Sequence, residues 1–147
     1  MYNFMNAVNK YRRAHWCATH HLKPIARFYE MWIYLIHNCS IPAECRIGSG
    51  TTFGYKGIGV VIHKRAVIGD NCVIAQGVTI GGRSHLYEVP VIGNNCYIGA
   101  GAKVLGPITI GNNVTIGANA VMMKDAPDNT TWAGVPARQL HANEATR

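Results

Sequence analysis

The second half of the chain carries an aliphatic residue at every sixth position. The series runs without a break through Ile62, Ile68, Ile74, Ile80, Leu86, Ile92, Ile98, Val104, Ile110 and Ile116. An α-helix repeats near 3.6 residues and a strand near 2, so neither element alone produces a period of six. The pattern predicts a parallel β-solenoid, in which each hexad forms one short strand and one turn. Three hexads would close one triangular coil of about 18 residues.

Glycines at a fixed place in the hexads support the same frame. The residues that follow the aliphatic positions include Gly69, Gly81, Gly93, Gly99, Gly111 and Gly117. Glycine is favoured where turns need unusual dihedral angles or where backbones approach closely. Side chains about 18 residues apart are therefore expected to stack from coil to coil. The expected columns are Ile62, Ile80, Ile98 and Ile116, then Ile68, Leu86, Val104 and Met122, and finally Ile74, Ile92 and Ile110.

The N-terminal part of the chain follows a helical period instead. Residues 2–21 and 25–38 are expected to be helical, with Pro24 at the start of the second segment. One apolar stripe on the second helix consists of Ile25, Phe28, Tyr29, Trp32 and Ile36. Such a stripe is typical of a helical cap that packs on the main body or on a neighbouring subunit.

A weak contact of these helices with a membrane surface is the second interpretation. It depends on basic residues placed beside two tryptophans, a composition typical of peripheral membrane helices. The residues are Arg12, Arg13, Lys23 and Arg27, beside Trp16 and Trp32. A spanning helix is not expected, because the most apolar stretch contains Glu30 and His37 and is shorter than the roughly 20 residues that spanning requires.

These patterns divide the chain into three segments. Residues 1–40 are expected to form an N-terminal helical segment, residues 41–128 the β-helix and residues 129–147 a C-terminal tail. The fold class is thus an all-β solenoid with an N-terminal α-helical cap. The helices and the tail would cover the two open ends of the prism, where strand edges are otherwise free to pair with other chains.

Composition narrows the class of protein further. The chain has 147 residues and is 48% hydrophobic, which suits a single folded domain. Its formal charge of +7 favours anionic partners such as phosphorylated cofactors, nucleic acid or a membrane surface. Five cysteines with no CxxC pair, and a start without an apolar signal core, indicate a reduced, cytoplasmic protein.

Three stretches resemble a known family of enzymes: "GVVIHKRAVIGDNCVIAQGVTIGG", "PVIGNNCYIGAGAKVLGPITIG" and "AGVPAR". They are similar to the hexapeptide-repeat acyltransferases, and above all to the serine acetyltransferases and the short capsule or exopolysaccharide O-acetyltransferases. The resemblance covers about residues 41–140. It implies a left-handed parallel β-helix, acetyl-CoA as co-substrate, and a homotrimer with active sites between subunits.

Acetyl transfer to a hydroxyl needs a base for the hydroxyl proton and a donor for the tetrahedral oxyanion. Histidine suits the base, because its ordinary pKa of about 6.5 lets it take and return a proton near neutral pH. Two histidines lie in the repeat region. His63 occupies a position where glycine stands in other hexads, and His85 lies in "GGRSHLYEVP", where the chain is expected to bulge as a loop. A solvated surface histidine is the alternative for each.

The resemblance supports the two histidines unequally. Sugar acetyltransferases of the superfamily carry a catalytic histidine in a loop before a "PVxIGNN"-like segment, and His85 matches that placement. Serine acetyltransferases carry theirs in the coil before "GIVIGE", where Tyr55 stands here and His63 follows later. Their acid before "IHPxAxIG" corresponds to Ser40. We expect His85 to be the base, His63 the second candidate, and backbone N–H groups near Gly81 to assist the oxyanion.

Small residues mark a candidate groove for coenzyme A. Gly82, Ala100 and Ala118 are expected to share one column, where exposed backbone groups can bind an extended pantetheine arm. Tight turns would also explain these residues, but the resembling enzymes carry Gly and Ala along their groove. The candidates for the phosphates of coenzyme A are Lys103, Lys124 and Arg138. Solvated surface charges are the alternative for these three.

The acceptor is less well specified by the sequence than the chemistry. The tail "HANEATR" lacks the terminal isoleucine of the serine acetyltransferases, and their long N-terminal helical region has no counterpart before residue 41. Both features favour a saccharide hydroxyl, with L-serine as the alternative acceptor. A non-catalytic scaffold protein is a further interpretation of the repeat. A zinc-dependent carbonic anhydrase is disfavoured, because those enzymes use three histidines and the coils offer two. Neither a metal site nor a nucleic-acid platform is predicted.

Overall fold

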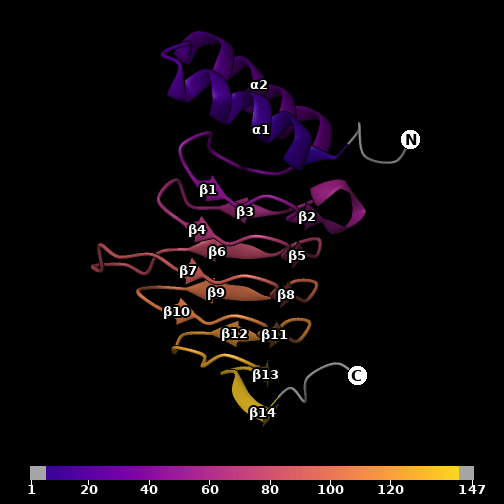
Figure 1. The fold of residues 1–147 in the computed structure, drawn as a ribbon, viewed down its shortest axis with the longest axis vertical. Helices are drawn as coiled ribbons and strands as arrows, with labels where there is room; N and C mark the ends of the chain where they lie inside the picture. Colours follow the sequence, from indigo (N-terminus) through magenta and orange to yellow (C-terminus); the bar gives the residue numbers. More distant parts are fainter. Residues whose placement is uncertain (1–5, 143–147) are drawn as a thin grey trace.

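A helical hairpin and a triangular stack of strands make up the computed structural model, which describes residues 6–142 (Figure 1). Helices α1 (Ala7–Thr19) and α2 (Lys23–His37) lie across one end of the stack, and strand β14 (Arg138–Ala142) lies at the other end. Asn6 caps α1 by accepting a hydrogen bond from the backbone N–H of Val8. The predicted parallel β-helix with an N-terminal helical cap is confirmed.

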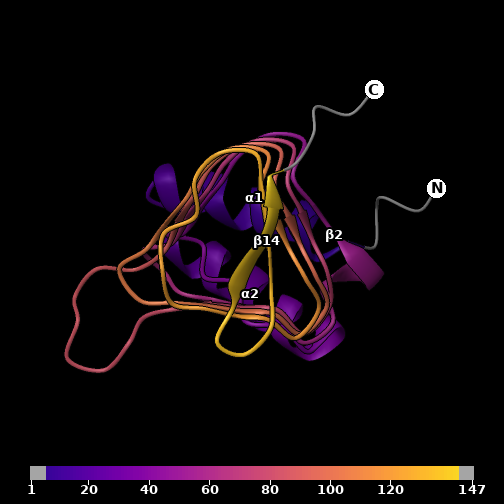
Figure 2. The same ribbon diagram turned by 90° about the horizontal axis from the view of Figure 1, so that it is seen from below.

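Three sheets form the sides of the prism (Figure 2). Sheet A consists of β3 (Val61–Ile62), β6 (Thr79–Gly81), β9 (Lys103–Leu105) and β12 (Val121–Met122). Sheet B consists of β1 (Arg46–Ile47), β4 (Val67–Ile68), β7 (Val91–Ile92) and β10 (Thr109–Ile110). Sheet C consists of β2 (Thr52–Phe53), β5 (Val73–Ile74), β8 (Tyr97–Ile98), β11 (Thr115–Ile116), β13 (Thr130–Ala133) and β14 (Arg138–Ala142). These ladders are parallel, except that β14 pairs antiparallel with β13.

The aliphatic residue of each hexad points its side chain into the core. Ile62, Ile68, Ile74 and Ile80 are at most 2% exposed, whereas the residue before each of them is exposed or half-buried. This alternation follows from the two-residue period of a strand. A period of six therefore buries one aliphatic side chain on each of the three sides of every coil.

The predicted columns are wrong beyond Ile80, because Ile98 stacks on Ile74 instead. That step spans 24 residues, since a loop at residues 82–90 lengthens one coil between β6 and β7. Leu86, which the pattern places in the core, lies in this loop and is 45% exposed. The observed columns are Ile62, Ile80, Val104 and Met122, then Ile68, Ile92 and Ile110, and finally Ile74, Ile98, Ile116 and Trp132.

A ladder of side-chain hydrogen bonds runs up the edge between sheets B and C. Asp70 accepts from the backbone N–H of Ser49 at 2.7 Å, Asn94 from that of Asp70 at 2.8 Å, and Asn112 from that of Asn94 at 2.8 Å. The residue after each acceptor turns the chain, and at Asn95 φ is 56°, a left-handed value that asparagine tolerates. The repeated "DN" and "NN" pairs of the sequence thus build this edge.

The apolar stripe predicted on α2 does not pack on the main body. Four of its members are between 42% and 57% exposed, namely Ile25, Phe28, Trp32 and Ile36. The helix packs instead through Ala26, Ile33 and His37, because the small Ala26 allows close approach to Ala14 of α1. Within residues 6–142, no helix is long and apolar enough to cross a bilayer.

Candidate active site

His63 lies at the A–B edge, where the chain leaves sheet A for sheet B directly after β3. Its ring Nδ1 accepts a hydrogen bond from the backbone N–H of Arg65 at 3.2 Å. That bond places the proton of the neutral ring on Nε2. Burial lowers the pKa of His63, and the charges of Arg65 and Lys64 lower it further. His63 is therefore a neutral imidazole whose Nε2–H is a hydrogen-bond donor.

His85 lies in the loop at residues 82–90, which projects from the prism at the same A–B edge (Figure 2). The backbone N–H of Leu86 donates to the carbonyl of Arg83 at 3.1 Å, and the φ of His85 is 67°. A left-handed conformation at a residue other than glycine is uncommon and is enriched at functional sites. The predicted bulge is present, and it holds the His85 side chain in solvent, where it is accessible to a substrate.

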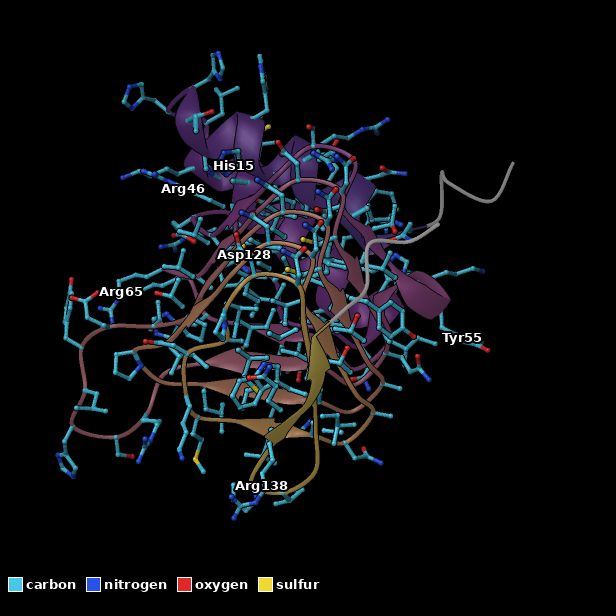
Figure 3. All side chains as sticks on the ribbon, turned by 60° about the horizontal axis from the view of Figure 1, so that its bottom comes forward. His15, Arg46, Tyr55, Arg65, Asp128 and Arg138 are labelled. Atoms are coloured by element: carbon cyan, nitrogen blue, oxygen red, sulfur yellow. The ribbon has the colours of Figure 1, made fainter. Side chains whose placement is uncertain are left out.

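Two contacts fix the base of this loop, and neither was predicted from the sequence. The guanidinium carbon of Arg65 lies 3.8 Å from the ring centroid of Tyr87, and Arg65 Nη2 donates to the carbonyl of Tyr87. Figure 3 shows Arg65 beside the projecting loop. On the other side, the Arg83 side chain lies over Gly106, where an added Cβ would stand 2.6 Å from Arg83 Cδ. Arg65 and Arg83 lie one coil apart in the sequence. No local pattern in the sequence indicates that both contact this part of the molecule.

The small residues predicted to share one column lie on two different edges. Ala100 and Ala118 are stacked at the C–A edge, where the backbone N–H of Asn119 donates to the carbonyl of Ala100 at 2.8 Å. Gly82 instead follows β6 at the A–B edge. The extra residues of the loop shift every later position by one side of the prism, so the expected single column of Gly82, Ala100 and Ala118 is wrong. Gln76, which follows β5, occupies the position at the C–A edge that was expected for Gly82.

The three candidate phosphate ligands are divided in the same way. Lys103 Nζ donates to the carbonyl of Gly77 at 2.8 Å, which places it beside the C–A edge. Arg138 pairs with Ala133 at the end of sheet C, close to the same edge, and its side chain is exposed (Figure 3). Lys124 follows β12 at the A–B edge. The C–A edge thus combines two cations with Ala100 and Ala118.

Tyr55 projects from the C–A edge of the first coil, in the short 3-10 helix η1 (Gly54–Gly57) (Figure 3). Its side chain is 77% exposed. Both Tyr55 and Lys56 have positive φ, 47° and 64°. Two consecutive left-handed residues other than glycine store backbone strain, which is common at functional sites. Ser40 forms an isolated parallel bridge with Val61 of β3, at the end of sheet A nearest the helices.

Two cysteines of the coils are packing residues. Both Cys72 and Cys96 are buried, and their thiols donate to the carbonyls of Gly93 and Gly111 at 3.2 and 3.0 Å. Hydrogen-bonded thiols in a closed core are not accessible nucleophiles. Among the residues that the structure describes, no group of three or more His, Cys, Asp or Glu side chains is arranged to hold a metal ion.

Comparisons with known proteins agree with the geometry of the coils. The family model described as "Bacterial transferase hexapeptide (six repeats)" matches residues 90–124. The serine acetyltransferase of Synechococcus elongatus is 39% identical over 142 residues, which are 95% of this chain and 58% of that protein. The serine acetyltransferase of Bacillus pumilus is 35% identical, over 97% of this chain and 66% of that protein. The chain thus spans between about half and two thirds of the length of these relatives.

Solved structures extend the similarity to three dimensions. The serine acetyltransferase of Brucella abortus in complex with coenzyme A has a TM-score of 0.90 at 36% identity, covering 95% of this chain and 56% of that one. A serine acetyltransferase in complex with cysteine has a TM-score of 0.87 at 33% identity, covering 95% and 55%. Both alignments cover almost the whole chain, well beyond the repeat alone. The chain therefore belongs to the hexapeptide-repeat transferases and is similar over nearly its whole length to the serine acetyltransferases.

Proposed function

We propose that this chain is an acetyl-CoA-dependent O-acetyltransferase and that its acceptor is L-serine. The observation that carries the proposal is the similarity, at a TM-score of 0.90 over 95% of the chain, to a serine acetyltransferase bound to coenzyme A. The relatives named above are serine acetyltransferases, and one structure holds cysteine, an amino acid of the same size as serine. These relatives reverse the preference for a saccharide that the sequence features favoured.

The proposed chemistry is direct transfer by the two histidines of the A–B edge. His85 takes the proton of the acceptor hydroxyl, whose oxygen attacks the thioester carbonyl. The carbon–sulfur bond then breaks, and the proton passes from His85 to the leaving thiolate. The Nε2–H of His63 is suited to donate to the oxyanion, because its Nδ1 already accepts from Arg65. A base of this kind contributes about 10²–10⁴ to the rate.

A homotrimer completes the proposed site. The histidines lie at the A–B edge, whereas Ala100, Ala118 and two cations lie at the C–A edge, with sheet A between them. In one prism the two groups of residues therefore lie on opposite sides of sheet A and do not face one another. Three prisms related by a threefold axis would place the A–B edge of one subunit against the C–A edge of the next. The separation of the two groups on one chain supports an active site shared between subunits.

A saccharide hydroxyl is the second candidate acceptor, and the residues at two positions favour it. By resemblance, serine acetyltransferases carry a histidine where Tyr55 stands and an acid where Ser40 stands. Neither tyrosine nor serine holds a negative charge near neutral pH, so neither pairs with the ammonium group of L-serine. The exposed position of Tyr55 also suits stacking on a sugar ring, since tyrosine has a broad apolar face.

Release of coenzyme A from acetyl-CoA tests the proposal and separates the acceptors. We expect turnover with L-serine, little turnover with D-serine or L-alanine, and slower turnover with monosaccharides and nucleotide sugars. Faster turnover with a saccharide than with L-serine would overturn the proposed acceptor but keep the acetyl transfer. If no acceptor accelerates release, and acetyl-CoA does not raise the thermal unfolding midpoint, the acetyltransferase proposal is wrong and a non-catalytic scaffold remains.

A further inference from the structure

Helix α2 carries a broad apolar surface that nothing in the described chain covers. Its exposed side chains include Ile25, Phe28, Trp32, Leu35 and Ile36, which are between 42% and 70% exposed. At 100° per residue, these side chains and Met31 span about 140° of the circumference of the helix. Trp16 of α1, 55% exposed, borders the same surface across a shallow groove shared with Ile25 and Tyr29. We call this set the α2 apolar face.

The α2 apolar face is continuous. The rings of Phe28 and Trp32 lie 6.0 Å apart between centroids, and those of Tyr29 and Trp32 lie 6.4 Å apart. Monomeric proteins rarely expose contiguous apolar patches of this extent unless the patch binds something. The core does not need these side chains, because α2 already packs on α1 and the first coil through Ala26, Ile33 and His37.

The charges around this face are almost all positive. Between residues 7 and 37 the chain carries Lys10, Arg12, Arg13, Lys23 and Arg27 against Glu30, and Glu44 of the following segment lines a groove with Arg27 and Glu30. Glu30 is already engaged, because its Oε1 accepts from the backbone N–H of Ala43 at 2.6 Å. Lys23 and Arg27 are exposed on the border between the polar and the apolar sides of α2. An anionic partner is therefore favoured, and a second copy of this cationic hairpin is disfavoured by repulsion of like charges.

An apolar face flanked by basic residues, with one tryptophan on each helix of the hairpin, is the composition of helices that lie in the interface of a bilayer. Insertion across the bilayer is excluded by length, since 15 residues of helix measure about 22 Å and the hydrocarbon core is about 30 Å thick. The hairpin lies at one end of the prism (Figure 1), so binding there leaves the A–B and C–A edges accessible. We propose that the α1–α2 hairpin docks this protein on an anionic membrane surface through the α2 apolar face. This proposal goes beyond the acetyl transfer proposed above and does not depend on it.

Vesicle flotation tests the docking. We expect the wild-type protein to float with phosphatidylcholine vesicles that contain a quarter phosphatidylglycerol, and to float much less with phosphatidylcholine alone. Leu35→Glu should lower the partition coefficient at least about tenfold, because it places a charge where an apolar side chain is buried in lipid. Leu140→Glu is the matched control, since Leu140 is 54% exposed on β14 at the opposite end and should not affect flotation. The double variant Lys23→Gln with Arg27→Gln should bind the anionic vesicles about 10- to 30-fold more weakly.

Two further measurements decide between the membrane and other occupants. Trp16 and Trp32 are exposed and Trp132 is buried, so a blue shift of tryptophan emission on adding vesicles reports burial of the α2 apolar face. Sedimentation of Leu35→Glu without lipid reports the oligomeric state. Docking is overturned if the wild-type protein does not float, or if Leu35→Glu floats as well as the wild type. It is also overturned if Leu35→Glu dissociates the assembly while vesicles leave the emission unchanged, because a second copy would then cover the face.

Discussion

The guanidinium carbon of Arg65 lies 3.8 Å from the centroid of the Tyr87 ring. This contact joins the residue that donates to His63 Nδ1 with the loop that carries His85. Both candidate histidines are therefore positioned by the same arginine. Because a loop that projects into solvent orders its side chains only through such contacts, the stacking should matter more for turnover than for the stability of the fold.

Replacing the ring of Tyr87 tests this positioning role. Tyr87→Leu removes the cation–π contact, and we expect kcat to fall about 3- to 10-fold with little change in the thermal unfolding midpoint. Tyr87→Phe keeps the ring and should retain nearly full kcat, since the hydroxyl is not part of the contact. Steady-state kinetics on both variants provide the measurement. Equal kcat in Tyr87→Leu and the wild type would show that the contact does not position the histidines.

Coenzyme A phosphates should be bound mainly at the C–A edge. Arg138→Gln removes a charge beside Ala118, and we expect the Kd for acetyl-CoA to rise about tenfold, the effect typical of one lost charge-assisted hydrogen bond. Lys124→Gln removes the same charge at the A–B edge and should raise the Kd less than Arg138→Gln. Isothermal titration with acetyl-CoA compares the two variants. The opposite order would place the phosphates at the A–B edge.

The repeat could be predicted from the sequence, but the position of one insertion could not. Ile80 and Ile92 both stay in the six-residue frame, because the extra segment of the loop between β6 and β7 equals one whole hexad. Leu86 occupies an aliphatic position of the six-residue repeat in the sequence, although its side chain is not part of the core. The pairings of Ile68 with Ile92, Ile74 with Ile98 and Ile80 with Val104 show that one coil is longer. This single shift divides the predicted coenzyme A residues between two edges.

Two truncations measure this difference in register. Ile92 is 1% exposed in a core column, so Ile92→Ala should lower the free energy of unfolding by about 2–5 kcal/mol. Leu86 is 45% exposed in the loop, so Leu86→Ala should change it by less than about 0.5 kcal/mol. Chemical denaturation of both variants gives the values. A large loss of unfolding free energy in Leu86→Ala would show that Leu86 packs in the core, and it would contradict the observed columns.

The packing side of the helical cap and the loop contacts could not be predicted from the sequence, for physical reasons. A 3.6-residue stripe shows that Phe28 and Trp32 share a side of α2, but it does not show which side meets the body. Small residues decided that question, because Ala26 allows a closer approach to α1 than any member of the stripe. The contact of Arg65 with Tyr87 joins side chains of different coils, and no local pattern in the sequence reports it.

His37 should make the helical cap sensitive to acid. The ring is buried, and Lys10 Nζ lies 2.8 Å from His37 Nε2, so the ammonium group donates to a neutral imidazole. Burial lowers the pKa of His37 below its ordinary 6.5, and the charges of Lys10 and Lys56 lower it further. Below about pH 6.5 the unfolded chain therefore binds more protons than the folded one at this residue, and stability decreases as the pH falls toward the lowered pKa.

Thermal unfolding between pH 7.5 and 5 measures this effect. His37→Gln keeps an acceptor for Lys10 but cannot be protonated, so its unfolding midpoint should decrease less on acidification than that of the wild type. His20→Gln is the control, because His20 is exposed at the end of α1 and should retain the wild-type dependence. If His37→Gln and the wild type lose stability in parallel, His37 does not govern the acid sensitivity.

The catalytic role of the A–B edge is tested most directly by the acetyl-transfer rate of His85→Ala. We expect kcat to fall about 10²- to 10⁴-fold, while the oligomeric state and the affinity for acetyl-CoA stay unchanged. His63→Ala should lower kcat as well, because it removes the proposed donor to the oxyanion. Full turnover by His85→Ala, with an intact assembly and unchanged acetyl-CoA binding, would contradict the assignment of this edge as the site of acetyl transfer.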